Sequence, residues 1–281
     1  MTGVGEAVRV DHISYVYPDG TVGLKEASLS IQEGEFLAFI GQNGSGKTTL
    51  SKNISGLLKP TTGDVWVFGR NTKEAPMSEL ATLVGYIFQN PDHQLFNQTV
   101  YDEIADGPRN LKLPEEEVEE RVTEAMRIVG LDESYREKHP FFLSKGLRQR
   151  VAIASILAMR PKVIIVDEPT TGQDFKQSID IMDFLTMLNR EHGHTIIIIT
   201  HDMPIVAKYA ERTVAMADGR ILLDGPTREV FAQAEVLARA NIKPPQITRL
   251  AQRLGDLGVP PSVLSIEEMA DLIESAVRGG G

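Results

Sequence analysis

Three short apolar runs rich in branched side chains constrain the fold of this 281-residue chain most strongly. They are FLAFI at 36–40, VIIV at 163–166 and TIIIIT at 195–200. Continuous runs of this length are typical of strands that are covered on both faces in a parallel sheet. Helical stretches lie between and around these runs, at 46–57, 115–130, 145–159, 174–191 and 203–211. Because strands alternate with helices, the sequence predicts an α/β protein.

The N-terminal part of the chain predicts a different kind of sheet. β-Favouring residues cluster or alternate around turn signals such as Pro18-Asp19-Gly20 and Glu33-Gly34. The strands expected from this pattern lie at 8–17, 24–31 and 64–69. Strands separated by such turns are typical of an antiparallel sheet, so we expect an antiparallel β flank beside the parallel core.

The C-terminal part of the chain is helical in composition. It follows Gly225-Pro226, and the pairs Pro244-Pro245 and Pro260-Pro261 divide it into pieces of roughly ten to sixteen residues. We therefore expect a small helical region after the main domain. The predicted division is a domain at 1–230, with a helical insertion at about 90–160, and a C-terminal helical extension at 231–281.

Composition and charge exclude several classes of protein. The shares of hydrophobic residues, 42%, and charged residues, 24%, are near the globular average, which excludes a largely disordered or low-complexity chain. The net charge of −10 disfavours nonspecific binding to nucleic acid or anionic lipid, because both need a surplus of positive charge. With no cysteine, the chain has no disulfide, no thiolate zinc site and no cysteine nucleophile.

The chain is not expected to enter or cross a bilayer by itself. Its N-terminal stretch, MTGVGEAVRVDHI, lacks the basic start and the apolar stretch of a signal peptide. No run in the sequence reaches the ~18–20 apolar residues of a membrane span.

The sequence GQNGSGKT at 41–48 predicts a phosphate-binding loop. It fits the pattern G-x-x-x-x-G-K-[ST] and lies between an apolar strand and a helix, which is the context that the pattern requires. Its glycines let backbone N–H groups point at phosphate oxygens, Lys47 adds a positive charge, and Thr48 can offer its hydroxyl to Mg²⁺. An ordinary glycine turn is the weaker interpretation. The candidate nucleotide-binding residues are Gly41, Asn43, Gly44, Ser45, Gly46, Lys47, Thr48 and Thr49.

Two adjacent carboxylates, Asp167 and Glu168, end the apolar run at 163–166. Ligands gather at the carboxyl ends of strands in open α/β sheets. In phosphoryl transfer one carboxylate is needed near Mg²⁺, which suits Asp167, and a second can orient or deprotonate water, which suits Glu168. Two exposed charges that cap a strand would be the preferred interpretation if no phosphate loop preceded them.

His201 follows the run TIIIIT, again at the end of an apolar strand. Its imidazole could therefore reach the same cleft and contact a γ-phosphate. Alone, a histidine in this position would more often cap a helix or pack in a core. The other histidines lack comparable positions, so the metal expected here is nucleotide-bound Mg²⁺.

With these motifs in this order, residues 8–230 resemble the ATP-binding subunit of an ABC transporter. After the phosphate loop come Gln89 in GYIFQ, LSKGL at 143–147 in place of the signature LSGGQ, VIIVDEPT, the segment 171–174 and His201. The resemblance implies that Gln89 senses Mg²⁺ and the membrane partner, that Glu168 is the general base, and that His201 is the γ-phosphate switch. It also implies that Asp174 lies in a loop that joins two subunits.

The resemblance further assigns Tyr17, in YVYPDG, to the aromatic residue that stacks on adenine. A strand aromatic packed on the sheet is an alternative interpretation, and Tyr15 is a rival for the role.

The stretch 88–108, together with the helical tail, is similar to the energy-coupling factor group, which takes up vitamins or cobalt and nickel ions. Another importer group with a similar helical subdomain is the alternative. Asp106 stands where that group often has an aromatic residue. Lys145 and Leu147 replace the first glycine and the glutamine of the signature. Ser144 and Gly146 remain, so this helix end can still offer a hydroxyl and amides to a γ-phosphate bound by a partner.

The function implied by the resemblance is ATP hydrolysis that powers solute uptake, with ATP and Mg²⁺ as cofactors. The expected partners are an integral membrane subunit, a separate substrate-binding membrane subunit and a second ATPase, with no nucleic acid. A heterodimer is favoured over a homodimer, because it would confine the altered signature to one of two sites. The expected location is peripheral, on the cytoplasmic face of the cell membrane.

The membrane subunit is expected to dock between Gln89 and Asp106, where an apolar cluster interrupts a polar segment. The cluster consists of Leu95, Phe96, Val100, Tyr101 and Ile104. Burial of these side chains inside the helical insertion is an equally good interpretation for any one of them.

Two other functions are considered. One is a soluble ABC ATPase that acts on nucleic acid or ribosomes, against which the net charge of −10 counts. The other is a P-loop kinase of a metabolite, which leaves LSKGL, Gln89 and His201 unexplained.

Overall fold

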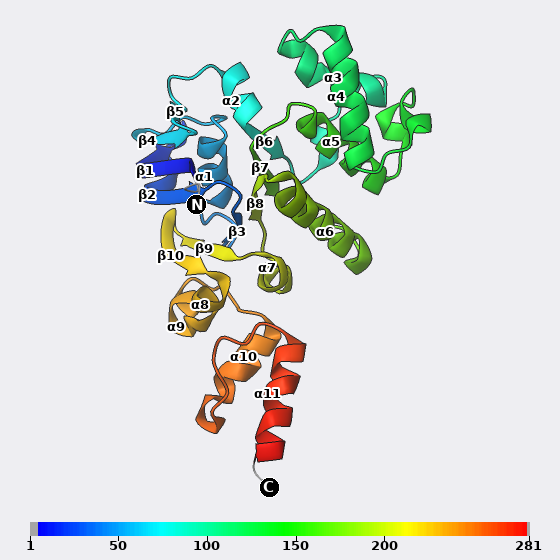
Figure 1. Ribbon diagram of the computed structural model, residues 1–281. Coiled ribbons are helices and arrows are strands. Elements are labelled where there is room, and N and C mark those ends of the chain that lie inside the picture. The colour runs from blue at the N-terminus through cyan, green and yellow to red at the C-terminus, as the bar shows by residue number, and fades with distance from the viewer. Residues whose placement is uncertain (1–4, 280–281) are drawn as a thin grey trace.

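The parallel core of the chain is a six-stranded sheet in the order β10-β9-β3-β8-β7-β6 (Figure 1). We describe it from a computed structural model in which residues 5–279 are described. The strands are β3 (Phe36–Ile40), β6 (Val84–Ile87), β7 (Val163–Asp167), β8 (Thr195–Ile199), β9 (Arg212–Ala217) and β10 (Arg220–Pro226). All neighbouring pairs are parallel except the pair between β9 and β10 at one edge. The predicted α/β class is confirmed.

A second sheet has four antiparallel strands in the order β2-β1-β4-β5. Its strands are β1 (Glu6–Val16), β2 (Val22–Gln32), β4 (Thr62–Val67) and β5 (Arg70–Asn71). It is the antiparallel flank that the sequence predicts. The helix α1 (Lys47–Ile54) lies between the two sheets, and its Leu50 and Ile54 are fully buried in the core that they share.

Side chains of the parallel strands alternate between two cores. In β3, Leu37 and Phe39 pack toward α1 and the antiparallel sheet, whereas Phe36, Ala38 and Ile40 pack on the opposite face. The opposite face is covered by α6 (Phe175–His192) and α7 (Met203–Tyr209). Both faces of the sheet are therefore buried, which is why its strands are continuous apolar runs.

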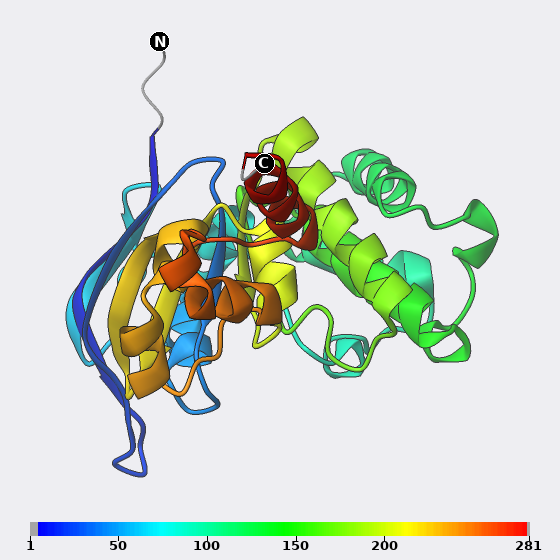
Figure 2. The ribbon, with the colours of Figure 1, turned by 90° about the horizontal axis from the view of Figure 1, so that it is seen from below.

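The helices between β6 and β7 form a lobe beyond the edge of the parallel sheet at which β6 lies. They are α3 (Val100–Asn110), α4 (Glu115–Ile128) and α5 (Lys145–Leu157), with short 3₁₀ turns at Pro91–His93, Glu133–Tyr135 and Pro140–Phe142. A further helix, α2 (Met77–Leu83), precedes β6. Figure 2 shows this lobe on the side of the molecule opposite the antiparallel strands.

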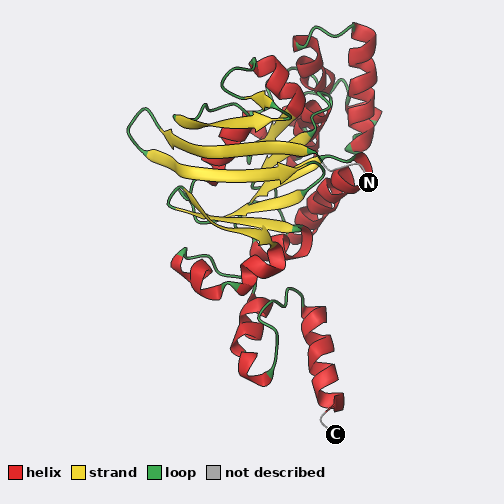
Figure 3. Ribbon diagram, turned by 60° about the vertical axis from the view of Figure 1, so that its left-hand side comes forward, coloured by secondary structure: helices red, strands yellow, loops and turns green. Residues whose placement is uncertain are grey.

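The C-terminal tail contains four helices and one 3₁₀ turn within the described residues. These are α8 (Thr227–Ala232), α9 (Ala234–Arg239), α10 (Gln246–Arg253), the turn Gly255–Leu257 and α11 (Ile266–Gly279). Phe231 and Leu237 of α8 and α9 are fully buried in the main core, whereas α10 and α11 share a small cluster of their own. Figure 3 shows α10 and α11 projecting away from the sheets. Residues 1–4 and 280–281 of the expected domains lie outside the described residues.

The proline pairs act as the sequence predicts, because Pro244-Pro245 separates α9 from α10 and Pro260-Pro261 separates α10 from α11. Within residues 5–279, none of the helices has the length and apolar character needed to span a membrane.

The strand β8, one of the two central strands of the parallel sheet, should contribute strongly to stability. Ile198 is fully buried, so Ile198→Ala should lower the free energy of unfolding by ~2–5 kcal/mol through lost burial and the cavity left behind. Urea unfolding followed by circular dichroism measures this. The control, Ile273→Ala, removes a side chain that is 49% exposed and should change the value far less. Equal losses in the two variants would contradict this account of the core.

Candidate active site

A cavity of about 580 Å³ lies at the carboxyl ends of β3, β7 and β8. Parallel strands end at the same edge of a sheet, so residues far apart in the sequence meet there. The structure brings most of the predicted site residues to its wall. They are Tyr17, Asn43, Gly44, Ser45, Gly46, Lys47, Thr48, Thr49, Gln89, Asp167, Glu168 and His201.

The phosphate loop connects β3 to α1 in a shape that requires glycine at two points. A Cβ on Gly41 would lie 2.4 Å from the backbone oxygen of Met216. At Gly46, where φ is +103°, a Cβ would lie 2.7 Å from the backbone oxygen of Gly23. Other residues would clash or be strained at both positions. The loop therefore places the N-terminus of α1 at the cavity, where its free N–H groups favour an anion.

Lys47 is the buried cation of the cavity. Its side chain is folded back along the loop, and Nζ donates to the Gly41 oxygen at 2.8 Å and to the Gln42 oxygen at 2.9 Å. Burial lowers the pKa of Lys47, and the negative charges of Glu168 and Asp167 oppose this change. Those acceptors hold the ammonium beside the position where the loop would cradle phosphates.

Asp167 is held by two hydroxyl groups from other parts of the chain. Tyr86 Oη donates to Asp167 Oδ2 at 2.8 Å, and Thr48 Oγ1 donates to the same oxygen at 3.3 Å. Burial raises the pKa of Asp167, and the hydrogen bond from Tyr86 opposes the rise. Burial is the main cause that raises the pKa of Tyr86, and the nearby charge of Asp167 raises it further. The phenol therefore stays protonated and remains a donor.

Glu168 has a strained backbone and an ordered side chain. Its φ of +52° lies in the left-handed region, which is uncommon for a residue with a side chain and is concentrated at functional sites. Oε2 accepts from Thr171 Oγ1 at 3.0 Å, and Oε1 lies 2.9 Å from His201 Nδ1. The carboxylate is thus fixed by two partners, while the histidine side chain is 67% exposed at the mouth of the cavity.

Tyr17 lies in the loop after β1 and contributes to the wall of the cavity. Its hydroxyl is 2.8 Å from Thr49 Oγ1, and Tyr15 packs edge-on against its ring with centroids 4.9 Å apart. Tyr15 itself packs against the core between the sheets. Of the two tyrosines, Tyr17 is the one that lines the cavity.

Ser144, Gly146 and Asp174 lie elsewhere. Ser144 is the N-cap of α5 and accepts a hydrogen bond from the backbone of Leu147, while Gly146 lines a different cavity beside that helix. Asp174 is the N-cap of α6 and accepts from the backbone N–H of Gln177. The exposed N-terminus of α5 therefore does not contribute to the cavity that contains this chain's own phosphate loop.

Sequence reasoning missed two residues that orient the carboxylates, Tyr86 and Thr171. Tyr86 lies in β6, a strand of only four residues that includes a glycine and gives a weak periodic signal. The one available signal was its place in GYIFQ, three residues before Gln89. Thr171 belongs to the segment 171–174, which the sequence analysis identifies, but its contact with Glu168 depends on the turn that follows β7.

The donor set of the cavity fits nucleotide-bound Mg²⁺. Thr48, Asp167 and Gln89 present hydroxyl, carboxylate and amide oxygens to one space, and Mg²⁺ prefers oxygen ligands completed by phosphates and water. The direct contact between Thr48 and Asp167 shows that two of these oxygens already converge.

Comparison with known proteins decides the family. Residues 24–171 match the family model described as ABC transporter. The chain is 43% identical, over 97% of its length and 98% of the relative's, to the energy-coupling factor transporter ATP-binding protein EcfA2 of Caldanaerobacter subterraneus subsp. tengcongensis. The chain belongs to the ATP-binding subunits of ABC transporters, in the energy-coupling factor group.

Other relatives support the same assignment. The chain is 52% identical to a putative ABC transporter ATP-binding protein of the same organism over 93% of its own length, but it spans 45% of that protein. Among solved structures, cbiO1 from Clostridium perfringens, part of the ABC transporter complex cbiONQ, is 40% identical with a TM-score of 0.75, covering 88% of this chain and 99% of that one.

A dimeric ATP-binding cassette in a post-hydrolysis state, bound to ADP and Pi, also matches. It is 31% identical, with a TM-score of 0.69, and the match covers 78% of this chain and 98% of that one. The chain has the fold of an ABC ATPase, which binds and hydrolyses ATP.

Glu168→Gln should preserve ATP binding and lower hydrolysis by ~10²–10⁴-fold, because an amide keeps the shape of the carboxylate but cannot accept the proton of water. Lys47→Ala should instead weaken ATP binding, since it removes the buried cation. Single-turnover hydrolysis and nucleotide binding are measured on the assembled complex.

The matched control for this experiment is Glu191→Gln, which neutralises an exposed carboxylate near the end of α6. It should leave both measurements unchanged. Near wild-type turnover in Glu168→Gln would contradict the assignment of Glu168 as the general base.

Proposed function

We propose that this ATPase powers solute uptake through an integral membrane transporter of the energy-coupling factor type. The observation that carries the proposal is the gathering of Lys47, Asp167, Glu168 and His201 in one cavity while the signature helix end lies outside it. Such a half-site needs a second ATPase to complete it. The full-length similarity to energy-coupling factor subunits supports the transporter context.

In the proposed reaction each residue has a defined task. The loop N–H groups and Lys47 bind the phosphates, and Tyr17 stacks on the adenine. Glu168, fixed by Thr171 and His201, accepts a proton from the attacking water, and the exposed His201 contacts the γ-phosphate. Thr48, Asp167 and Gln89 are the residues that would hold Mg²⁺, and the bound ion would offset charge on the phosphates.

The second ATPase is proposed to meet this chain at the N-terminus of α5. Ser144 and Gly146 are exposed there, and a helix N-terminus suits a γ-phosphate held by the partner. We favour a heterodimer, because Lys145 and Leu147 would then alter only the site built on the partner's phosphate loop. A homodimer, in which both sites carry the change, is the alternative.

The membrane subunit is proposed to dock in a groove of about 350 Å³ beside the helical lobe. Apolar side chains with exposed surface line it, namely Leu57, Met77, Phe88 and Phe96. Asp106 adds a negative charge to the groove, so a partner helix with a basic residue fits it. Phe88 adjoins Gln89, which connects the groove to the nucleotide cavity.

The five apolar side chains on which the predicted docking site was based differ in their exposure to solvent. Leu95, Val100 and Ile104 are buried in the core of the lobe. Tyr101 lies under the guanidinium groups of Arg109 and Arg136, so it is held within the lobe. Phe96 is the member of the cluster that is open to solvent, with 69% exposure.

We further propose that the chain is peripheral on the cytoplasmic face of the membrane, and that a separate membrane subunit binds the solute. Residues 1–230 would form the ATP-binding domain, with the lobe at about 90–160 as its insertion and 231–281 as an appended extension. Action on nucleic acid or ribosomes is not favoured, because the full-length relatives are transporter subunits and the charge is −10.

Phe96→Asp should release the ATPase from its membrane complex without unfolding it, because a carboxylate cannot enter an apolar contact without a large desolvation cost. Co-purification with the membrane subunit and thermal unfolding of the free chain are measured together. Leu222→Asp, which changes an exposed side chain of β10, is the control and should co-purify normally. Retention of Phe96→Asp in the complex would rule out this groove.

The native complex should contain two different ATPase chains. Purification of the tagged chain from its native host with its membrane partner, followed by mass spectrometry, identifies every ATPase present. Recovery of this polypeptide alone, with two equivalent hydrolysing sites, would contradict the heterodimer.

A further inference from the structure

Three hydrogen bonds join the N-terminal half of α5 to the loop 169–174, and we call this set of contacts the strap. Lys145 Nζ donates to the backbone oxygen of Gly172 at 3.1 Å. Gln173 Nε2 donates to Gln149 Oε1 at 2.7 Å, and Gln149 Nε2 donates to the backbone oxygen of Pro169 at 3.3 Å. The strap therefore joins α5 to the first residue of the loop and to two residues near its C-terminal end.

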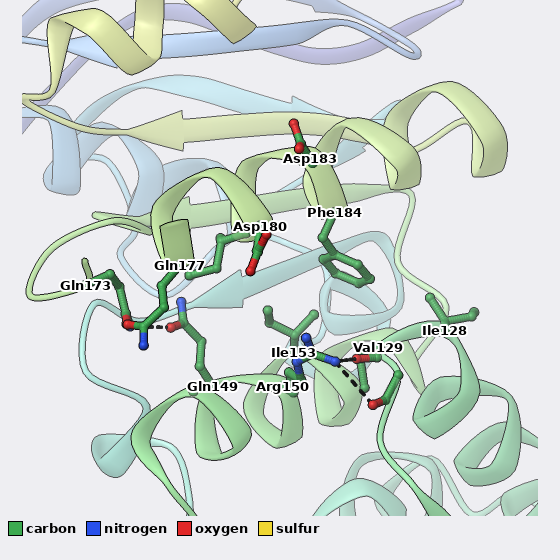
Figure 4. Close-up of a pocket in the computed structure, with 13 residues that line it drawn as sticks. Ile128, Val129, Gln149, Arg150, Ile153, Gln173, Gln177, Asp180, Asp183 and Phe184 are labelled. Carbon is green, nitrogen blue, oxygen red and sulfur yellow. Dashed lines mark hydrogen bonds between the residues drawn. The ribbon is translucent and has the colours of Figure 1, made fainter. Parts of the chain in front are cut away.

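A cavity of about 540 Å³ lies behind the strap, between α5 and α6. Figure 4 shows Gln149 and Gln173 pointing toward each other at one edge of it, with Ile153 and Phe184 facing the cavity from the two helices. Open space separates the two helices here, so they pack less closely at this end than in the apolar core that they share farther along. At this end of α5, the strap provides the direct connection to the loop.

The loop continues the connection to the active site. Thr171 lies between the strap residues Pro169 and Gly172, and its Oγ1 donates to Glu168 Oε2 at 3.0 Å. Its backbone N–H also donates to the backbone oxygen of Glu168 at 3.3 Å. Glu168 has a strained backbone, so its position depends on such surrounding contacts.

Lys145 has a specific place in this network. It occupies the signature position where the resemblance implies a glycine, and a glycine has no side chain that could donate to the Gly172 oxygen. The side chain of Lys145 lies so close to the loop that a Cβ on Gly172 would be 2.8 Å from Nζ. The lysine therefore does more than interrupt the signature, because it adds a contact within the same chain.

We propose that Lys145, Gln149 and Gln173 are positioning residues, which couple the position of Glu168 to the position of the N-terminus of α5. The inference rests on the proposed function, in which that helix end meets ATP bound by the second ATPase. A displacement of that helix end would then be passed to Glu168 through the strap, and Lys145 adds a connection that a glycine at this position could not make.

The first test uses the purified full-length chain alone. In the variant Lys145→Met/Gln173→Leu both side chains keep about their size and lose their donors. Hydrogen exchange at the Thr171 amide should become at least ~5-fold faster, the low end of typical couplings, while amides at 151–157 are unchanged. Lys145→Arg, which can still donate, and Lys176→Met, which removes an exposed lysine charge on α6, should match wild type. Unchanged exchange in the double variant would overturn the proposal.

The second test measures ATP hydrolysis by the assembled complex. The double variant should lower kcat by ~5–50-fold and leave the KM for ATP within about twofold, because the strap acts on the base and not on binding. The single variant Lys145→Met should lower kcat, whereas Lys145→Arg, which keeps a donor at this position, should keep kcat near the wild-type value. A loss of ATP affinity with unchanged kcat would contradict a positioning role.

The two tests separate this inference from the proposed function. A wild-type chain that assembles with no second ATPase would refute the proposed function, and the exchange experiment on the chain alone would still decide whether the strap holds the loop.

Discussion

Everything in the candidate site depends on one constraint, the parallel alignment of β3, β7 and β8. Burial of both faces of this sheet holds the three strands in register, and their carboxyl ends reach one edge together. The phosphate loop follows one strand, Asp167 and Glu168 end the second, and His201 follows the third. The hydrogen bond between Thr48 and Asp167 joins groups 119 positions apart, so the apolar core sets the geometry of the polar site.

The sequence predicted the parts of the fold that have a strong local signal. The runs at 36–40, 163–166 and 195–200 became β3, β7 and β8, because branched apolar residues suit strands that are covered on both faces. The strands β6, β9 and β10 and the helix α3 were not identified individually. β6 is short and contains Gly85, and α3 contains Gly107 and Pro108, which are breaker signals in a sequence. Those elements form because the surrounding core packs against them.

The candidate site was predicted where chemistry is encoded in residue type and spacing, and missed where it depends on contacts across the fold. Lys47 was predicted from the phosphate-loop pattern, and Asp167, Glu168 and His201 were predicted from their positions at strand ends. All four line one cavity. The contacts from Tyr86 and Thr171 to the carboxylates depend on how β6 and the loop after β7 lie in space. Likewise, Lys145 could be seen in the sequence as a departure from the signature, but its contact with Gly172 could not.

The central claim is that ATP occupies the cavity between Tyr17 and the strand ends. Photolabelling with 8-azido-ATP, followed by peptide mapping, tests it most directly, because the azide reacts with the residues beside the adenine. The account predicts labelling in the peptide that contains Tyr17, and competition by unmodified ATP should remove the label. Labelling confined to the cavity between α5 and α6, or to the C-terminal helices α10 and α11, would contradict the account.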